Sequence, residues 1–152
     1  GGTDTIVVNA LDGTDVVEVD IALAGTVGGA LGDAQPDAVV VNGTPGDDVA
    51  LVSGAPGNVD VAGLAAAISI STPEPANDRL TLNFLAGDDT LDASGLLANV
   101  IQLTADGGPD NDTLIGSDGA DVLLGGDGDD VLIGGPGVDV LDGGTGNNII
   151  IQ

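Results

Sequence analysis

The chain has 152 residues, of which 25 are acidic and one, Arg79, is basic, so its formal net charge is −24. This sign excludes nucleic acid as a partner, because phosphate binding requires Lys and Arg, and it disfavours an anionic membrane surface. The sequence contains no His, Cys, Tyr or Lys. Because the usual catalytic bases, nucleophiles and zinc ligands are therefore missing, we predict that the chain is not an enzyme.

The hydrophobic residues argue against simple disorder, because they make up 42% of the chain. Phe84 is the only aromatic residue, and a core of Val, Ile, Leu and Ala suits the thin, regular layers of a solenoid. No apolar run approaches the roughly 18 residues of a membrane span, so we expect no membrane insertion. No signal peptide is visible, and a chain without methionine is expected to be a processed product or a piece of a longer protein.

A loose repeat occupies the first two-thirds of the chain. The segments DTIVVNALDGTD, DAVVVNGTPGDD and DRLTLNFLAGDD begin at Asp4, Asp37 and Asp78. In each, aliphatic residues alternate as in a strand, an Asn follows five residues after the first Asp, and an Asp closes the segment. The offsets of 33 and 41 residues predict two larger coils per repeat. The shared Asn residues (Asn9, Asn42 and Asn83) are expected to be turn residues or stacked amides, with a ligand role as the alternative.

Residues 107–151 divide into five consecutive nonamers: GGPDNDTLI, GSDGADVLL, GGDGDDVLI, GGPGVDVLD and GGTGNNIII. Six turn-forming residues followed by three strand-forming residues predict a tight turn and a short strand with one inward side chain. Two nonamers would complete one coil and would stack the aliphatic residues of position eight inside it. These residues are Leu114, Leu123, Leu132, Leu141 and Ile150.

Both parts use a strand, a turn containing Gly and Asp, and another strand. We therefore predict an all-β fold, a right-handed parallel β-helix or β-roll solenoid. Degenerate coils are expected over residues 1–105, with repeat units starting near residues 4, 37 and 78. A strict nonapeptide β-roll is expected over residues 106–152, continuous with the first part.

The nonamers resemble the RTX (repeats-in-toxin) calcium-binding family, whose pattern is G-G-x-G-x-D-x-U-x. The chemistry of the residues agrees with this resemblance. Ca²⁺ prefers six to eight oxygen ligands from carboxylates and carbonyls, and glycine turns expose carbonyls beside the short Asp carboxylate. Stacked Asp side chains one coil apart, about 4.7–4.9 Å, would repel each other without a cation between them.

The resemblance implies that each ion lies between one turn and the next turn but one along the chain. Asp112 would then pair with Asp130, Asp121 with Asp139, and Asp130 with Asn148, giving about three bridged calcium sites. Turn carbonyls would complete the ligand sets. The implied carbonyl donors are Gly107, Pro109, Gly116, Asp118, Gly125, Gly126, Asp127, Gly128, Gly134, Gly135, Pro136, Gly137, Gly144 and Gly146.

The first two-thirds holds a second group of metal candidates. Gly-Asp-Asp at 46–48 and at 87–89 matches half of the motif, and Asp15 closes the first loose repeat in the same way. The alternative for Asp15, Asp48 and Asp89 is an ordinary solvated turn.

These patterns predict a secreted, calcium-binding structural solenoid at the cell surface or in the extracellular space, which folds when it meets calcium. Because no cap is apparent at either end, head-to-tail stacking of copies into filaments or matrix is expected. The alternative is a C-terminal calcium-binding and secretion module of a larger secreted hydrolase, toxin or adhesin.

Overall fold

A computed structural model describes residues 2–26, 29 and 31–152. In these residues the regular structure consists of strands, and no helix is long and apolar enough to cross a membrane. The strands are β1 Thr5–Val8, β2 Glu18–Ala22, β3 Ala38–Asn42, β4 Val49–Ala55, β5 Asn58–Ala62, β6 Ala67–Ser71, β7 Arg79–Asn83, β8 Thr90–Leu96, β9 Gln102–Pro109, β10 Thr113–Ile115, β11 Asp121–Asp127, β12 Val131–Ile133, β13 Val140–Asp142 and β14 Ile149–Ile151. The prediction of an all-β chain is therefore confirmed.

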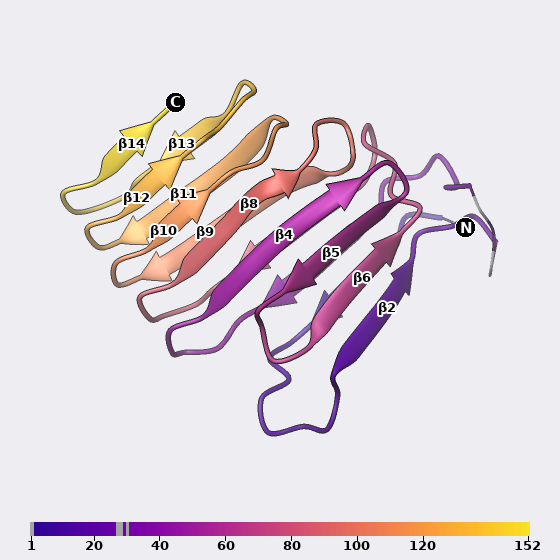
Figure 1. Ribbon diagram of the computed structural model, residues 1–152, viewed down its shortest axis with the longest axis horizontal. Helices are drawn as coiled ribbons and strands as arrows, with labels where there is room; N and C mark the ends of the chain where they lie inside the picture. Colours follow the sequence, from indigo (N-terminus) through magenta and orange to yellow (C-terminus); the bar gives the residue numbers. More distant parts are fainter. Residues whose placement is uncertain (1, 27–28, 30) are drawn as a thin grey trace.

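The strands form two sheets that face each other (Figure 1). The smaller sheet has the order β1-β3-β7-β9-β11-β13, and its neighbouring strands are all parallel. The larger sheet has the order β14-β12-β10-β8-β4-β5-β6-β2. From β7 onwards successive strands alternate between the sheets, as in a β-roll. Both sheets continue across the predicted boundary near residue 105.

The core lies between the sheets and is built from aliphatic residues that stack one coil above another. On the smaller sheet, Val41 lies beside Leu82 and Leu82 beside Ala105, and the row continues to Leu123. On the larger sheet Leu91 lies beside Leu114 and Leu114 beside Leu132, both of which are position-eight residues. Leu114, Leu123 and Leu132 are completely buried, Leu141 packs against the core, and Ile150 is half exposed. The predicted inward position is thus correct, and burial decreases toward the last coil.

The coils differ in length along the chain. In the C-terminal part Thr113 pairs with Val131 and Val122 with Val140, which is a spacing of two nonamers. In the first part β1 pairs directly with β3, and β3 with β7. Each loose repeat therefore makes one coil, and not the two coils that its length suggested.

An antiparallel insertion accounts for much of the extra length. β5 pairs antiparallel with β4 and with β6, and β6 then pairs in parallel with β2. The turn between β4 and β5 contains Pro56 and Gly57, which has a φ of 98°. Proline followed by glycine with positive φ is the combination that a tight turn favours. Here the fold departs from the predicted continuous parallel solenoid.

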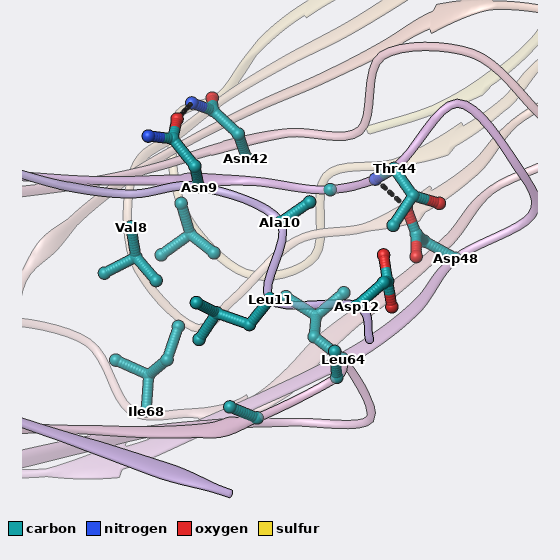
Figure 2. Close-up of a pocket in the computed structure, with 14 residues that line it drawn as sticks. Val8, Asn9, Ala10, Leu11, Asp12, Asn42, Thr44, Asp48, Leu64 and Ile68 are labelled. Carbon is teal, nitrogen blue, oxygen red and sulfur yellow. Dashed lines mark hydrogen bonds between the residues drawn. The ribbon is translucent and has the colours of Figure 1, made fainter. Parts of the chain in front are cut away.

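The shared Asn residues of the first part form a stacked-amide row. The Asn42 side-chain amide donates to the Asn9 carbonyl oxygen at 3.0 Å, and the Asn83 amide donates to Asn42 at 2.9 Å. Figure 2 shows the first of these bonds, beside a pocket between the first two coils. The row ties three coils together, as one of the two expectations for these residues stated.

Replacing Leu123 by alanine is expected to lower the free energy of unfolding by about 2–5 kcal/mol, because the cavity lies in a closely packed row. Val122, the preceding residue, is only partly buried, so Val122→Ala serves as a control and should cost clearly less. Urea unfolding in saturating calcium measures both. Equal losses for the two variants would contradict the assignment of the inward face.

Candidate metal centre

A row of four aspartates and one asparagine runs along the edge of the solenoid where the chain enters the larger sheet. Each member is the last residue of a turn and immediately precedes a strand of that sheet. Asp and Asn favour such turn positions because their short side chains can accept hydrogen bonds from the nearby main chain. The members, taken coil by coil, are Asp48, Asp89, Asp112, Asp130 and Asn148. We refer to them as the entry row.

Main-chain hydrogen bonds connect the entry row. The backbone N–H of Asp112 donates to Oδ1 of Asp130 at 2.9 Å, and that of Asp130 donates to Oδ1 of Asn148 at 2.7 Å. Asp48 and Asp89 make the same kind of bond, to Asp89 and Asp112 at 2.7 and 2.9 Å. Each side chain therefore reaches the neighbouring coil, and like charges are held in a line.

Bonds of the same kind lie on the edge where the chain enters the smaller sheet, from the Asp4 N–H to Asp37 and from the Asp37 N–H to Asp78. The backbone N–H of Asp121 donates to Oδ1 of Asp139 at 3.0 Å. With the entry row, the structure thus places all three predicted pairs of residues in neighbouring coils. That these pairs ligate calcium remains a prediction.

Three carboxylates of the entry row keep one oxygen without a partner. Oδ2 of Asp89, of Asp112 and of Asp130 is buried and makes no hydrogen bond. These residues are 1%, 1% and 0% exposed. A buried charged oxygen without a partner is strongly unfavourable, so each of these atoms needs a proton or a cation.

The backbone four residues before each Asp decides which oxygens stay unpaired. The N–H groups of Thr44 and Ser117 each donate at 2.6 Å to Oδ2 of Asp48 and Asp121. At the corresponding positions before Asp112 and Asp130, Gly108 and Gly126 have φ of 107° and 116°. No donor reaches Oδ2 of these two aspartates. Glycine in the left-handed region therefore accompanies each unpaired oxygen in the nonamers.

Glycine lets the main chain pass close to these oxygens. A Cβ atom on Gly125 would run into Oδ2 of Asp130 and would lie 2.9 Å from the carbonyl oxygen of Gly143. Gly107 has the same surroundings, with Oδ2 of Asp112 and the Gly125 carbonyl at 2.8 Å. A carboxylate oxygen and a carbonyl oxygen from the next coil thus approach the same place. Oxygen donors of these two kinds are the ligands that Ca²⁺ prefers.

Burial and neighbouring charge also change the acidity of the entry row. Burial, opposed by the hydrogen bond from Asp89 and reinforced by the charges of Asp89 and Asp130, raises the pKa of Asp112 to about 7. Burial likewise raises the pKa of Asp89 to about 6, with the charge of Asp48 adding to it. A cation between the coils would favour the ionised forms instead.

No three carboxylates converge in the part of the chain that the structure describes. Each row has one side chain from each coil, so an ion between two coils would contact two side chains. It would therefore take most of its six to eight oxygens from the main chain. This agrees with the implied ligand sets, in which most donors are turn carbonyls.

A second row of side chains, which the sequence analysis missed, lies at position five of the turns. The N–H of Asn111 donates to Asp88 at 3.0 Å, that of Asp129 to Asn111 at 2.9 Å, and that of Asn147 to Asp129 at 2.8 Å. These bonds run in the opposite direction to those of the entry row. Asn alternates with Asp here and separates the charges. The Asp or Asn at position five of alternate nonamers was the available signal.

The three candidates from the first two-thirds are placed differently. Asp48 and Asp89 belong to the entry row, whereas Asp15 is exposed in a bend outside it. Asp12, and not Asp15, lines the same pocket as Asp48 (Figure 2).

Comparison with protein families matches the RTX calcium-binding nonapeptide repeat, in four copies, to residues 106–141 and 115–150. Searches of curated proteins and of solved structures gave no match. The match covers the five-nonamer segment that contains Asp112, Asp121, Asp130 and Asp139. Residues 106–150 of this chain are therefore an array of RTX calcium-binding nonapeptide repeats.

Proposed function

We propose that this chain is a calcium-dependent structural solenoid that works outside the cell and has no catalytic role. The observation that carries the proposal is the set of buried Asp oxygens without a hydrogen-bond partner in the entry row. We propose about three bridged calcium ions, at Asp112 with Asp130, at Asp121 with Asp139, and at Asp130 with Asn148. The coils are proposed to be right-handed, as nearly all parallel β crossovers are.

Calcium binding and folding should be a single event. The chain has a net charge of −24 and one basic residue to offset it. Without cations, rows of carboxylates at the spacing of strands repel each other and favour an expanded chain. When ions bind only the folded form, their binding free energy stabilises the fold.

The proposed extracellular location rests on the affinity that calcium modules of this kind generally have. Calcium-binding modules outside the cell sit at the weak end of the affinity range, with a Kd of about 10⁻⁴ to 10⁻³ M. A chain of this kind would stay expanded where calcium is scarce and fold where it is abundant. Export of the unfolded chain is an inference by analogy with the family that the nonamers resemble.

A module within a larger protein is the second candidate. The family match is restricted to residues 106–150, so the repeats form only one part of the chain. On this proposal the solenoid is the C-terminal calcium-binding and secretion part of a secreted hydrolase, toxin or adhesin.

End-to-end stacking is proposed as a further property of the solenoid. Ile149, Ile150 and Ile151 are 56%, 49% and 50% exposed on β14, which is the outermost strand of the larger sheet. An apolar strand at a sheet edge favours pairing with another strand. A second copy is the proposed occupant, and a following segment of a longer chain would cover the same edge.

The test is a calcium titration from EDTA, followed by far-ultraviolet circular dichroism and light scattering, with magnesium as the control ion. We expect conversion to β-structure with calcium and not with magnesium, which demands six ligands in a strict geometry. Rising scatter would support stacking, and folding without scatter would remove it from the proposal. Full β-structure in EDTA would contradict calcium-driven folding.

A further inference from the structure

The turn at residues 84–89 has positive φ at the same two places as the nonapeptide turns, although it lies outside the matched repeats. Leu85 has a φ of 80°, where Gly126 in the later turn has 116°, and Gly87 has 124°, where Gly128 has 152°. Leucine rarely adopts positive φ, so the surrounding structure must hold this residue there. The turn therefore copies the nonapeptide geometry without the first two glycines of the motif.

This turn also stacks on its neighbour as the repeats stack on one another. The Leu85 carbonyl oxygen lies so close to Gly108 that a Cβ atom on Gly108 would overlap it. The Gly108 carbonyl meets Gly126 in the same way one coil later. The turn at 84–89 thus occupies the place that a preceding RTX turn would have.

The carboxylate at the end of this turn is free to ligate a cation. Asp89 is 1% exposed, and its Oδ2 has no hydrogen-bond partner. One coil earlier the situation differs, because the Thr44 N–H donates to Oδ2 of Asp48. The series of unpaired oxygens therefore begins at Asp89.

A main-chain oxygen is available beside it. In the last coil the N–H of Thr145 donates to the Gly126 carbonyl at 2.8 Å. Pro109 stands at the corresponding position next to Leu85, and proline has no N–H to donate. The Leu85 carbonyl consequently does not receive this bond.

We propose that the turn at residues 84–89 holds a calcium ion together with the turn at residues 107–112, in addition to the ions of the RTX array. Its ligands include the carboxylates of Asp89 and Asp112 and the carbonyl of Leu85. This inference rests on the proposed function, because it extends the same row of sites by one coil. The calcium-binding stack then begins in the degenerate part of the chain.

The test counts bound calcium ions by native mass spectrometry and isothermal titration calorimetry at saturating calcium. Asp89→Asn is expected to bind one ion fewer than the parent chain, whereas Asp48→Asn should bind the full number. Asparagine keeps a side-chain oxygen that can accept the Asp48 N–H in Asp89→Asn and the Thr44 N–H in Asp48→Asn. Circular dichroism in calcium checks that both variants fold. The inference is overturned if Asp89→Asn keeps every ion, or if Asp48→Asn loses the same ion.

A second pair of variants tests the backbone of the turn and does not alter the carboxylate. Leu85→Gly accepts positive φ without strain, and Leu85→Val, which is β-branched, opposes it. The calcium concentration at half-saturation of this ion should be lower for the glycine variant than for the valine variant. Equal values would contradict the inference.

The outcome for the parent chain separates the two levels of proposal. If the parent chain binds no calcium, the proposed function itself fails. If the parent chain binds calcium and Asp112→Asn loses ions while Asp89→Asn does not, only the additional site fails.

Discussion

Replacing Asp130 by alanine is expected to raise the calcium concentration at the midpoint of folding by at least about tenfold, equivalent to about 1.4 kcal/mol. Asp130 is completely buried and belongs to two of the three pairs proposed to bridge a calcium ion, with Asp112 and with Asn148. The substitution removes a carboxylate ligand from both sites. It also leaves the buried N–H of Asp112 without its acceptor, which by itself costs about 1–3 kcal/mol.

Two other variants serve as controls for this result. Asp139→Ala affects only the proposed site with Asp121, so its midpoint should shift less than that of Asp130→Ala. Asp20→Ala removes the same charge from an exposed position on β2 and should leave the midpoint nearly unchanged. Calcium titrations followed by circular dichroism give all three midpoints. Similar shifts for Asp130→Ala and Asp20→Ala would show that only total charge matters.

In EDTA, lowering the pH from about 8 to about 5 is expected to increase the population of β-structure. The folded-state pKa values of Asp112 and Asp89 are raised to about 7 and about 6, chiefly by burial. A group with a raised pKa binds protons more readily in the folded chain than in the unfolded one. Ionisation of these two carboxyl groups therefore destabilises the fold. The destabilisation is at its largest above about pH 7 and decreases as the pH falls through the two pKa values.

Asp112→Asn tests the origin of this pH dependence, because asparagine is neutral at every pH. We expect the gain of β-structure in EDTA to depend less on pH in this variant. In saturating calcium the carboxylates are held in the ionised form, and acid should then weaken the fold by displacing the ion. Circular dichroism across this pH range gives both profiles. A calcium-free chain whose β-structure is the same at all these pH values would contradict the role of the buried carboxylates.

The repeats of the C-terminal part could be read from the sequence because their length never changes. Every nonamer places its aliphatic strand residues at the same positions, so residues 18 apart fall in register. The inward position of Leu114 and Leu123 follows from that spacing, and the pairing of Asp112 with Asp130 is what the resemblance to the RTX repeats implies. A strict short period leaves the chain one way to bury its aliphatic residues while keeping its turns outside.

The long coils could not be read in the same way. Their closure depends on which distant strands pair, and a turn at Pro56 and Gly57 diverts the chain into an antiparallel insertion. The repeat of 41 residues therefore makes one coil, although its length would also allow two. Local pattern describes each strand but does not say which strand lies beside it.

The all-β class and the nonapeptide array could be predicted from the residues and their spacing, and the resemblance to the RTX repeats added the acidic pairs. Which carboxylate oxygens remain without a partner could not be predicted, because it depends on one backbone angle four residues earlier. The Thr44 N–H donates to Oδ2 of Asp48, whereas Leu85, which has positive φ and stacks on Gly108, leaves Oδ2 of Asp89 without a partner. Leucine has no intrinsic preference for that angle, so the contacts between coils, and not the residue type, create the difference.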